Sequence, residues 1–260
     1  MKTREKIPHS SLRRKVSFNL PVRWKDLTQE QLRIVLTLYV TFGDQTDGLN
    51  EVKMSALANF ANIGFIRPMD DGYLCVLLDS GDHFLLDAEL LPGIIANLEF
   101  LEHPEKMDIR LETFGKFKAK SMYLEEITFE QYLCLENWYQ TYLVTRDDAM
   151  LREMATVMYG MEKAQTERIK SDILLGIFLW YGAVKHRFAD LYPHFLRPAS
   201  GGGQICQESL REAIDAQLRL LTKGDVTKIN GVLQTLLPYA LAELDALARE
   251  AEEMKRKYGK

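Results

Sequence analysis

The side chains that could do chemistry in this chain are few and scattered. The histidines are His9, His83, His103, His186 and His194. His186 and His194 lie eight residues apart with Pro193 between them, a spacing that matches no established pattern of metal ligands. Each histidine is therefore interpreted as a surface or helix-end residue, and no metal site is predicted.

Carboxylates gather around one turn. Asp79, Asp82, His83 and Asp87 are close enough in sequence to surround a cation. They lack the graded oxygen spacing and the twelfth-position glutamate of a calcium loop. Asp-Ser-Gly-Asp is instead typical of a tight turn, because Asp, Ser and Gly each favour turn conformations. The cluster is interpreted as turn chemistry, and no cofactor is predicted.

Other catalytic motifs are absent from the sequence. Gly201 to Gly203 is not followed by the lysine and serine of a phosphate loop. Nucleophile-elbow, zinc-protease and kinase signatures do not occur. No catalytic residue is therefore predicted, and the sequence favours a protein that is not an enzyme. An enzyme whose groups are distant in sequence stays an alternative, with a deep polar pocket at the acidic turn as its expected sign.

Composition is that of a globular protein. The 260 residues are 47% hydrophobic and 27% charged, with a net charge of −4, enough for one large domain or two modest ones. Three dispersed cysteines and a polar, basic N-terminus without an apolar signal segment favour a cytoplasmic location. The longest apolar run, Ile173 to Val184, is shorter than the roughly twenty residues of a membrane span, and predicts a buried helix.

The elements that would position any site are mostly helices. The stretch Thr128 to Gly160 predicts two helices, because Thr128 and Gln131 form a capping box and the acidic corner at Asp147 can start the second helix. Earlier in the chain, a helix starts at Thr28, Val16 to Leu20 alternates like a short strand, and the runs Tyr73 to Leu78 and Phe84 to Leu86 predict a β-hairpin. Ala88 to Leu101 predicts a further helix.

The fold class expected is mainly α (α+β), with a small β-hairpin element in the N-terminal half and a helical bundle in the C-terminal half. The predicted regions are a basic flexible arm at 1–15, an α+β region at 16–126 and an all-helical region at 127–260. Their boundary is expected near Leu124 to Ile127, with one continuous domain as the alternative. Arg197 to Gly203 has the composition of a flexible linker.

The last predicted helix carries a narrow apolar stripe. Its residues are Leu241, Leu244, Leu247, Ala248, Ala251 and Met254. The stripe either packs on the protein's own core or binds a partner helix, and it is the candidate partner-binding site. The basic N-terminal residues offer a second kind of partner, because eight Lys and Arg accompany one Glu between Met1 and Lys25. Nucleic acid is an alternative partner there, although no aromatic residue is interleaved within the arm for base stacking.

Several phrases together resemble uncharacterised phage and prophage proteins found near tail tube and tape-measure genes. They are Phe18 to Gln31 (FNLPVRWKDLTQEQ), Ile127 to Tyr132 (ITFEQY) with the aspartate-rich corner and the helix ending Met158-Tyr159, and Phe188 to Phe195 (FADLYPHF). The similarity spans most of the chain, but it rests on helix caps and aromatic core positions.

The resemblance implies a tail-assembly chaperone or an adaptor that shields a helical, tape-measure-like chain. It implies a protein of the bacterial host's cytoplasm, or one that stays in the virion, and it supplies no catalytic residues. The function expected is therefore binding of an amphipathic helical partner, or self-association, with a DNA-associated accessory protein and a motif-less enzyme as the alternatives.

Overall fold

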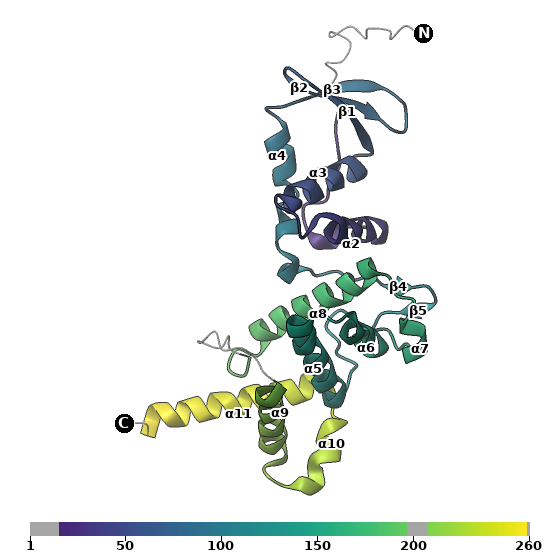
Figure 1. The fold of residues 1–260 in the computed structure, drawn as a ribbon. Coiled ribbons are helices and arrows are strands. Elements are labelled where there is room, and N and C mark those ends of the chain that lie inside the picture. Colours follow the sequence, from purple (N-terminus) through teal and green to yellow (C-terminus); the bar gives the residue numbers. More distant parts are fainter. Residues whose placement is uncertain (1–15, 197–206, 259–260) are drawn as a thin grey trace. The chain divides into compact units, whose positions relative to one another are not determined.

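The computed structural model describes residues 16–196 and 207–258, and it divides the chain into two compact units (Figure 1). Unit 1 ends at Pro104 and unit 2 begins at Glu105. The fold is mainly α with small antiparallel sheets, as the sequence predicts. The predicted arm at 1–15 and the predicted linker at 197–203 lie outside the described residues.

Unit 1 combines two helices with a three-stranded sheet. In chain order its elements are η1 (Trp24–Asp26), α2 (Gln29–Phe42), α3 (Gly48–Phe60), β1 (Ile63–Met69), β2 (Gly72–Leu77), β3 (His83–Asp87), α4 (Leu91–Ala96) and η2 (Glu99–Glu102), and η3 (Pro104–Lys106) lies at the boundary. Helix α3 contacts α2, β1, α4 and η2, so it holds the unit together.

The sheet has the antiparallel order β1-β2-β3. Cys75 of β2 is paired with Phe84 of β3, and both side chains are buried in one apolar cluster with Ile63 and Leu86. The predicted hairpin is confirmed. Strand β1 was not predicted, because Pro68 and a bulge between Phe65 and Arg67 interrupt its alternation.

Two other predictions for unit 1 were wrong in detail. Val16 to Leu20 alternates in burial but joins no sheet; Val16 and Phe18 pack against the sheet cluster instead. The single helix predicted over Ala88 to Leu101 is interrupted, because α4 ends at Ala96. There the Asn97 side chain donates to the carbonyls of Gly93 and Ile94, which competes with continuation of the helix.

Polar contacts fix the end of unit 1 against its helices. The Trp24 indole N–H donates to the His103 carbonyl at 3.1 Å. Lys53 on α3 is buried and pairs with Glu102 at 2.5 Å. This hydrogen bond from Lys53 holds the pKa of Glu102 below its usual range. The chain therefore leaves unit 1 from a fixed position.

Unit 2 is a helical assembly that starts with a β-hairpin whose strands are two residues long. Its elements are β4 (Thr113–Phe114), β5 (Phe117–Lys118), α5 (Phe129–Thr145), α6 (Asp148–Met158), α7 (Lys163–Thr166), α8 (Ser171–Leu191), α9 (Gln207–Thr222), η4 (Val226–Lys228), α10 (Ile229–Leu233) and α11 (Leu237–Tyr258). The apolar run Ile173 to Val184 lies in α8, whose buried residues include Trp180 and Tyr181, so the predicted buried helix is confirmed.

The division between the units falls earlier than the expected boundary near Leu124 to Ile127. The reason is that residues 105–126 are hydrogen-bonded to the helices of unit 2. The Trp180 indole donates to the Met122 carbonyl at 2.7 Å, and the Tyr159 hydroxyl donates to the Leu111 carbonyl at 2.8 Å. The chain between 105 and 126 therefore packs with the helices that follow it.

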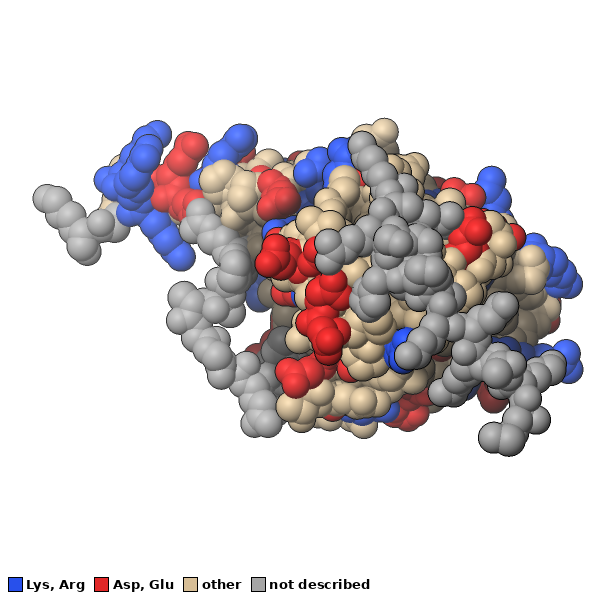
Figure 2. Space-filling view, turned by 90° about the horizontal axis from the view of Figure 1, so that it is seen from above, with Lys and Arg blue, Asp and Glu red and all other residues tan. Residues whose placement is uncertain are grey.

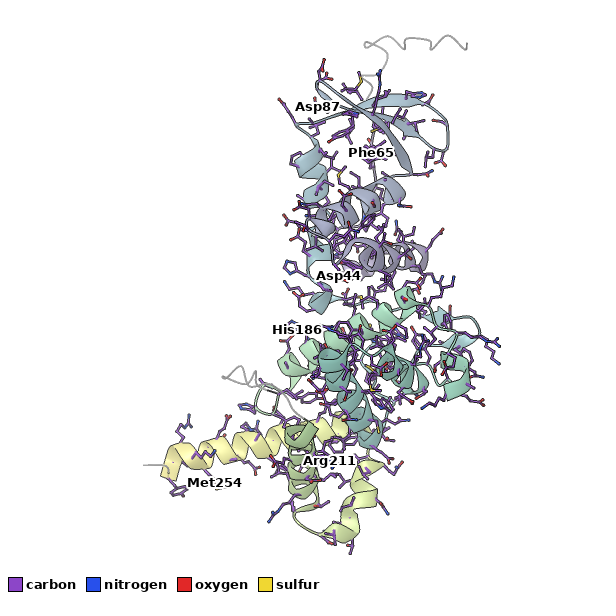
Figure 3. All side chains as sticks on the ribbon, in the orientation of Figure 1. Asp44, Phe65, Asp87, His186, Arg211 and Met254 are labelled. Carbon is purple, nitrogen blue, oxygen red and sulfur yellow. The ribbon has the colours of Figure 1, made fainter. Side chains whose placement is uncertain are left out.

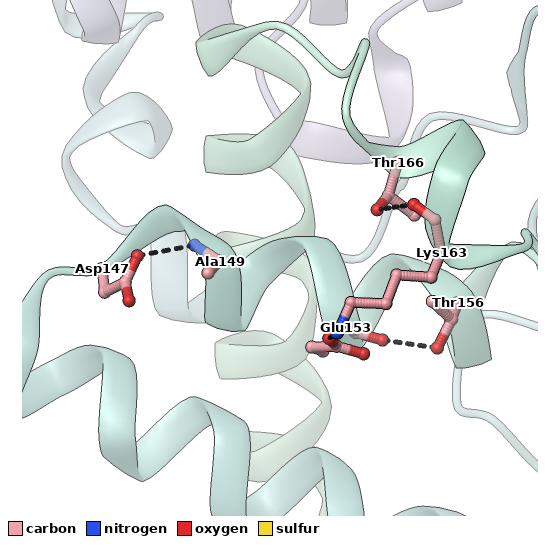
Figure 4. Close-up of polar contacts among 6 residues, drawn as sticks. All are labelled: Asp147, Ala149, Glu153, Thr156, Lys163 and Thr166. Atoms are coloured by element: carbon pink, nitrogen blue, oxygen red, sulfur yellow. Dashed lines mark hydrogen bonds and ion pairs between the residues drawn. The ribbon is translucent and has the colours of Figure 1, made fainter.

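The helix pair α5 and α6 begins as its sequence predicts. Thr128 and Gln131 form the capping box of α5, and the Asp147 carboxylate accepts from the Ala149 amide at 2.9 Å at the start of α6 (Figure 4). The ion pair between Glu153 and Lys163 then joins α6 to α7. Glu153 raises the pKa of Lys163 through this contact. Local capping thus sets the ends of the central helices.

Candidate functional site

Helix α11 is the element that carries the predicted partner-binding residues. Its start is joined to α5: the Leu237 amide donates to the Ile127 carbonyl at 2.9 Å, and the Phe129 amide donates to the Thr235 carbonyl at 2.8 Å. Pro238 falls within its first turn, where a missing amide hydrogen costs little. The helix then runs past α9 and projects beyond the rest of unit 2 (Figure 1).

One apolar stripe runs the full length of α11. Its members, which recur at alternating spacings of three and four residues, are Leu237, Ala240, Leu244, Leu247, Ala251, Met254 and Tyr258. Exposure rises along it: Leu244 is 1% exposed, Met254 is 61% exposed and Tyr258 is 81% exposed. The same face of the helix therefore begins inside the core and ends in solvent.

The structure separates the six predicted residues into two groups. Leu241 and Leu244 are buried in the core of unit 2, so they are internal in this chain and do not form an open binding surface. Leu247 and Ala248 are half-buried, and Ala251 and Met254 are exposed. Figure 3 shows Met254 on the projecting part of α11. We name Leu247, Ala251, Met254 and Tyr258 the distal stripe.

Tyr258 was missed by the sequence reasoning. It follows Met254 by four residues, so the spacing that identified the other members extends to it. The basic residues Lys255, Arg256 and Lys257 precede it in the last turn of the helix, where positive charge is favourable.

The opposite side of α11 is held by the segment that follows α8. The Asp245 carboxylate accepts from the backbone amides of His194 and Phe195 at 2.8 and 3.0 Å. Glu252 lies 3.1 Å from the His194 imidazole. At about 100° per residue, Met254 lies roughly half a turn around the helix from both Asp245 and Glu252. These contacts fix the helix while leaving the distal stripe on its other side.

A polar cluster lies between α5 and α8. The Glu136 carboxylate accepts from the Tyr181 hydroxyl at 3.1 Å and from the Gln140 amide at 2.7 Å, and it pairs with Lys185. Tyr181 is fully buried, and burial together with the nearby Glu136 raises its pKa. With its carboxylate satisfied by donors of its own chain, the cluster acts as a structural connection between the two helices.

We expect Tyr181→Phe to lower the free energy of unfolding of unit 2 by about 1.5–3 kcal/mol, because it removes a hydrogen bond to a charged group that is largely buried. Urea denaturation followed by circular dichroism measures the change. Tyr239→Phe is the matched control, since Tyr239 is 71% exposed. Equal stability of the two variants would show that Tyr181 contributes through packing alone.

The residues of the acidic turn are engaged locally. Asp79 accepts from the Asn62 amide at 2.6 Å, Ser80 donates to Asp82 at 2.8 Å, and Asp87 accepts from the Glu89 amide at 2.9 Å. Within the described ranges, no three His, Cys, Asp or Glu side chains are grouped as metal ligands would be. The turn thus has the chemistry of a β-hairpin connection.

A cleft of about 480 Å³ lies in unit 1 beside β3. It is lined by Val16 and residues 18–20, by residues 84–87 of β3 and by Leu90, Ile94 and Asn97 around α4, and most of these side chains are apolar. Among the described residues that line it, Asp87 has the one ionisable side chain, and Asp79 and Asp82 do not line it. The cleft therefore does not converge on Asp79 and Asp82 of the acidic turn.

Taken together, the fold and the site define a mainly α protein whose last helix carries a partly exposed apolar stripe. Comparison with protein families, with proteins of curated function and with solved structures gives no match. No helix in the described parts of the chain is long and apolar enough to cross a membrane.

Proposed function

We propose that this protein is a non-enzymatic assembly protein or adaptor that binds an amphipathic helix of a protein partner on the distal stripe of α11. The observation that carries the proposal is the course of the α11 stripe. Its first residues are buried in unit 2, whereas Met254 and Tyr258 are 61% and 81% exposed on the same face. A partner helix placed there would extend the packing that the core begins.

The rest of α11 supports this use. The helix is already formed and fixed by Asp245 and Glu252, so a partner does not have to order it. Binding to a preorganised surface avoids that entropic cost. Figure 2 shows acidic and basic side chains on the projecting end, and charged groups of this kind can orient a partner. The surface is narrow, as suits a single helix.

The proposed setting is a phage-like tail system, where the partner is a tape-measure-like helical chain. It is supported by the resemblance of the sequence to phage tail-region proteins. The capping boxes at Thr28 and Thr128, which carry part of that resemblance, occur in the structure as helix starts. The DNA-binding alternative depends largely on residues 1–15, which lie outside the described residues.

The test is recovery of partners from a lysate of the source organism with wild-type protein and two variants. We expect the wild type to recover a long, helix-rich chain, and Met254→Glu to lose it, because a charge in the distal stripe would have to be desolvated on binding. Tyr239→Glu is the matched control, since Tyr239 is exposed on the same helix outside the stripe. Equal recovery by all three proteins, read by mass spectrometry, would contradict the proposed site.

A further inference from the structure

The spacing within the distal stripe is that of a coiled-coil seam. From Leu247, its members follow after four, three and four residues, which places them at successive a and d positions of a heptad repeat. The buried Leu237, Ala240 and Leu244 occupy earlier positions of the same repeat. The seam is therefore continuous from the core of unit 2 to Tyr258, and its last part has no covering element among the described residues.

The charged residues beside the seam are complementary to a second copy of the same helix. In the heptad register set by the stripe, Glu250 and Lys257 occupy g positions and Lys255 occupies an e position. In a parallel pair, Glu250 of one copy lies beside Lys255 of the other; in an antiparallel pair, it lies beside Lys257. Either direction brings opposite charges together twice, and all three side chains are exposed.

The size of the seam sets the strength of such a pair. From Leu247 to Tyr258 it is about 16 Å long at 1.5 Å per residue. A single pair of helices in contact over this length buries less surface area than a standard protein interface. An isolated helix of this length would be marginal in water, but here the first half of α11 nucleates it. The seam therefore fits a weak, concentration-dependent association.

We propose that, in the purified protein, the distal stripe of α11 is occupied by the distal stripe of a second copy of this chain. The proposal rests on the proposed function, since it names the first helix that the binding surface accepts. A self-paired stripe would be shielded from solvent until a partner helix with a longer apolar face displaces it. Met254 and Tyr258 would then be covered in the dimer.

Charge reversal tests this pairing directly. Sedimentation equilibrium over the micromolar range should show a monomer–dimer equilibrium for the wild type. Glu250→Lys should weaken the dimer about tenfold, because it replaces two attractive contacts by repulsive ones. The double variant Lys255→Glu with Lys257→Glu should weaken it similarly. An equimolar mixture of the two variant proteins should restore association.

Glu253→Lys is the matched control, since Glu253 is also exposed on α11 but lies outside the a, d, e and g positions. A wild type that stays monomeric throughout, or a Glu250→Lys variant that behaves like Glu253→Lys, would overturn the proposal. Either result leaves the proposed function standing if Met254→Glu still abolishes recovery of a partner. If Glu250→Lys does not weaken a dimer and Met254→Glu does not reduce partner recovery, then the distal stripe is not a helix-binding surface.

Discussion

The substitution Leu244→Ala is expected to lower the free energy of unfolding of unit 2 by about 2–5 kcal/mol, whereas Met254→Ala should change it by less than about 0.5 kcal/mol. Both residues belong to the same stripe of α11. Leu244 is 1% exposed, so truncation leaves a cavity that its neighbours fill only in part. Met254 is 61% exposed and already contacts water in the isolated chain.

Urea denaturation at low protein concentration, where any dimer dissociates, measures both values. Leu241→Ala should behave like Leu244→Ala, because Leu241 is equally buried. A large loss of stability on Met254→Ala under these conditions would show that the distal stripe is part of the core, and the proposed binding surface would be withdrawn. A small loss on Leu244→Ala would instead mean that α11 contributes little to unit 2.

Helix starts were the part of this fold most readily predicted from the sequence. Thr28 and Thr128 are each followed three residues later by a glutamine, and the structure shows both reciprocal hydrogen bonds at each site. Asp147 caps α6 as expected. These features were predictable because a cap is a contact between residues only two or three positions apart. It forms without help from tertiary packing or from residues distant in sequence.

Features that depend on distant residues were less predictable. Strand β1 pairs along β2 in spite of Pro68, and the boundary between the units is set by contacts such as that of Trp180 with Met122. In residues 105–126 apolar and charged residues alternate only weakly, and no sequence pattern there shows that the segment packs with the later helices. Their position follows from burial against α6 and α8, and this is information that only the folded chain contains.

The candidate site shows the same division. Periodicity identified α11 as amphipathic and selected Leu241 to Met254 as its stripe, because spacings of three and four residues are visible in the sequence. Periodicity did not show where the core ends. That position depends on how far α5 and α9, which are distant in sequence, pack along α11.

Phe84→Ala is expected to destabilise unit 1 by about 3–5 kcal/mol while leaving unit 2 unchanged. Phe84 is 2% exposed, lies opposite Cys75 in the sheet and contacts the Phe18 ring at 6.0 Å between centroids. Each unit has a buried core of its own. A cavity in the sheet cluster of unit 1 should therefore lower the free energy of unfolding of that unit alone.

The rate of cysteine alkylation measures the opening of each unit separately, because Cys75 lies in unit 1 and Cys134 lies in unit 2. Cys75 is fully buried, and burial raises the pKa of its thiol to about 11, so it reacts as a thiolate mainly after unit 1 opens. Phe84→Ala should speed labelling of Cys75 by at least about a hundredfold, since about 1.4 kcal/mol corresponds to a tenfold change in the open population. Labelling of Cys134 on α5 should not change.

The reciprocal variant completes the argument. Phe129→Ala removes a fully buried ring from unit 2 and should leave Cys75 unaffected while speeding labelling of Cys134, by a smaller factor because Cys134 is only half-buried in the folded unit. Mass spectrometry of the peptides that contain each cysteine distinguishes the two sites. If either substitution accelerates both cysteines equally, the two units unfold as one cooperative body. In that case Leu244→Ala would destabilise unit 1 as well, and a change in α11 would be transmitted to the whole chain.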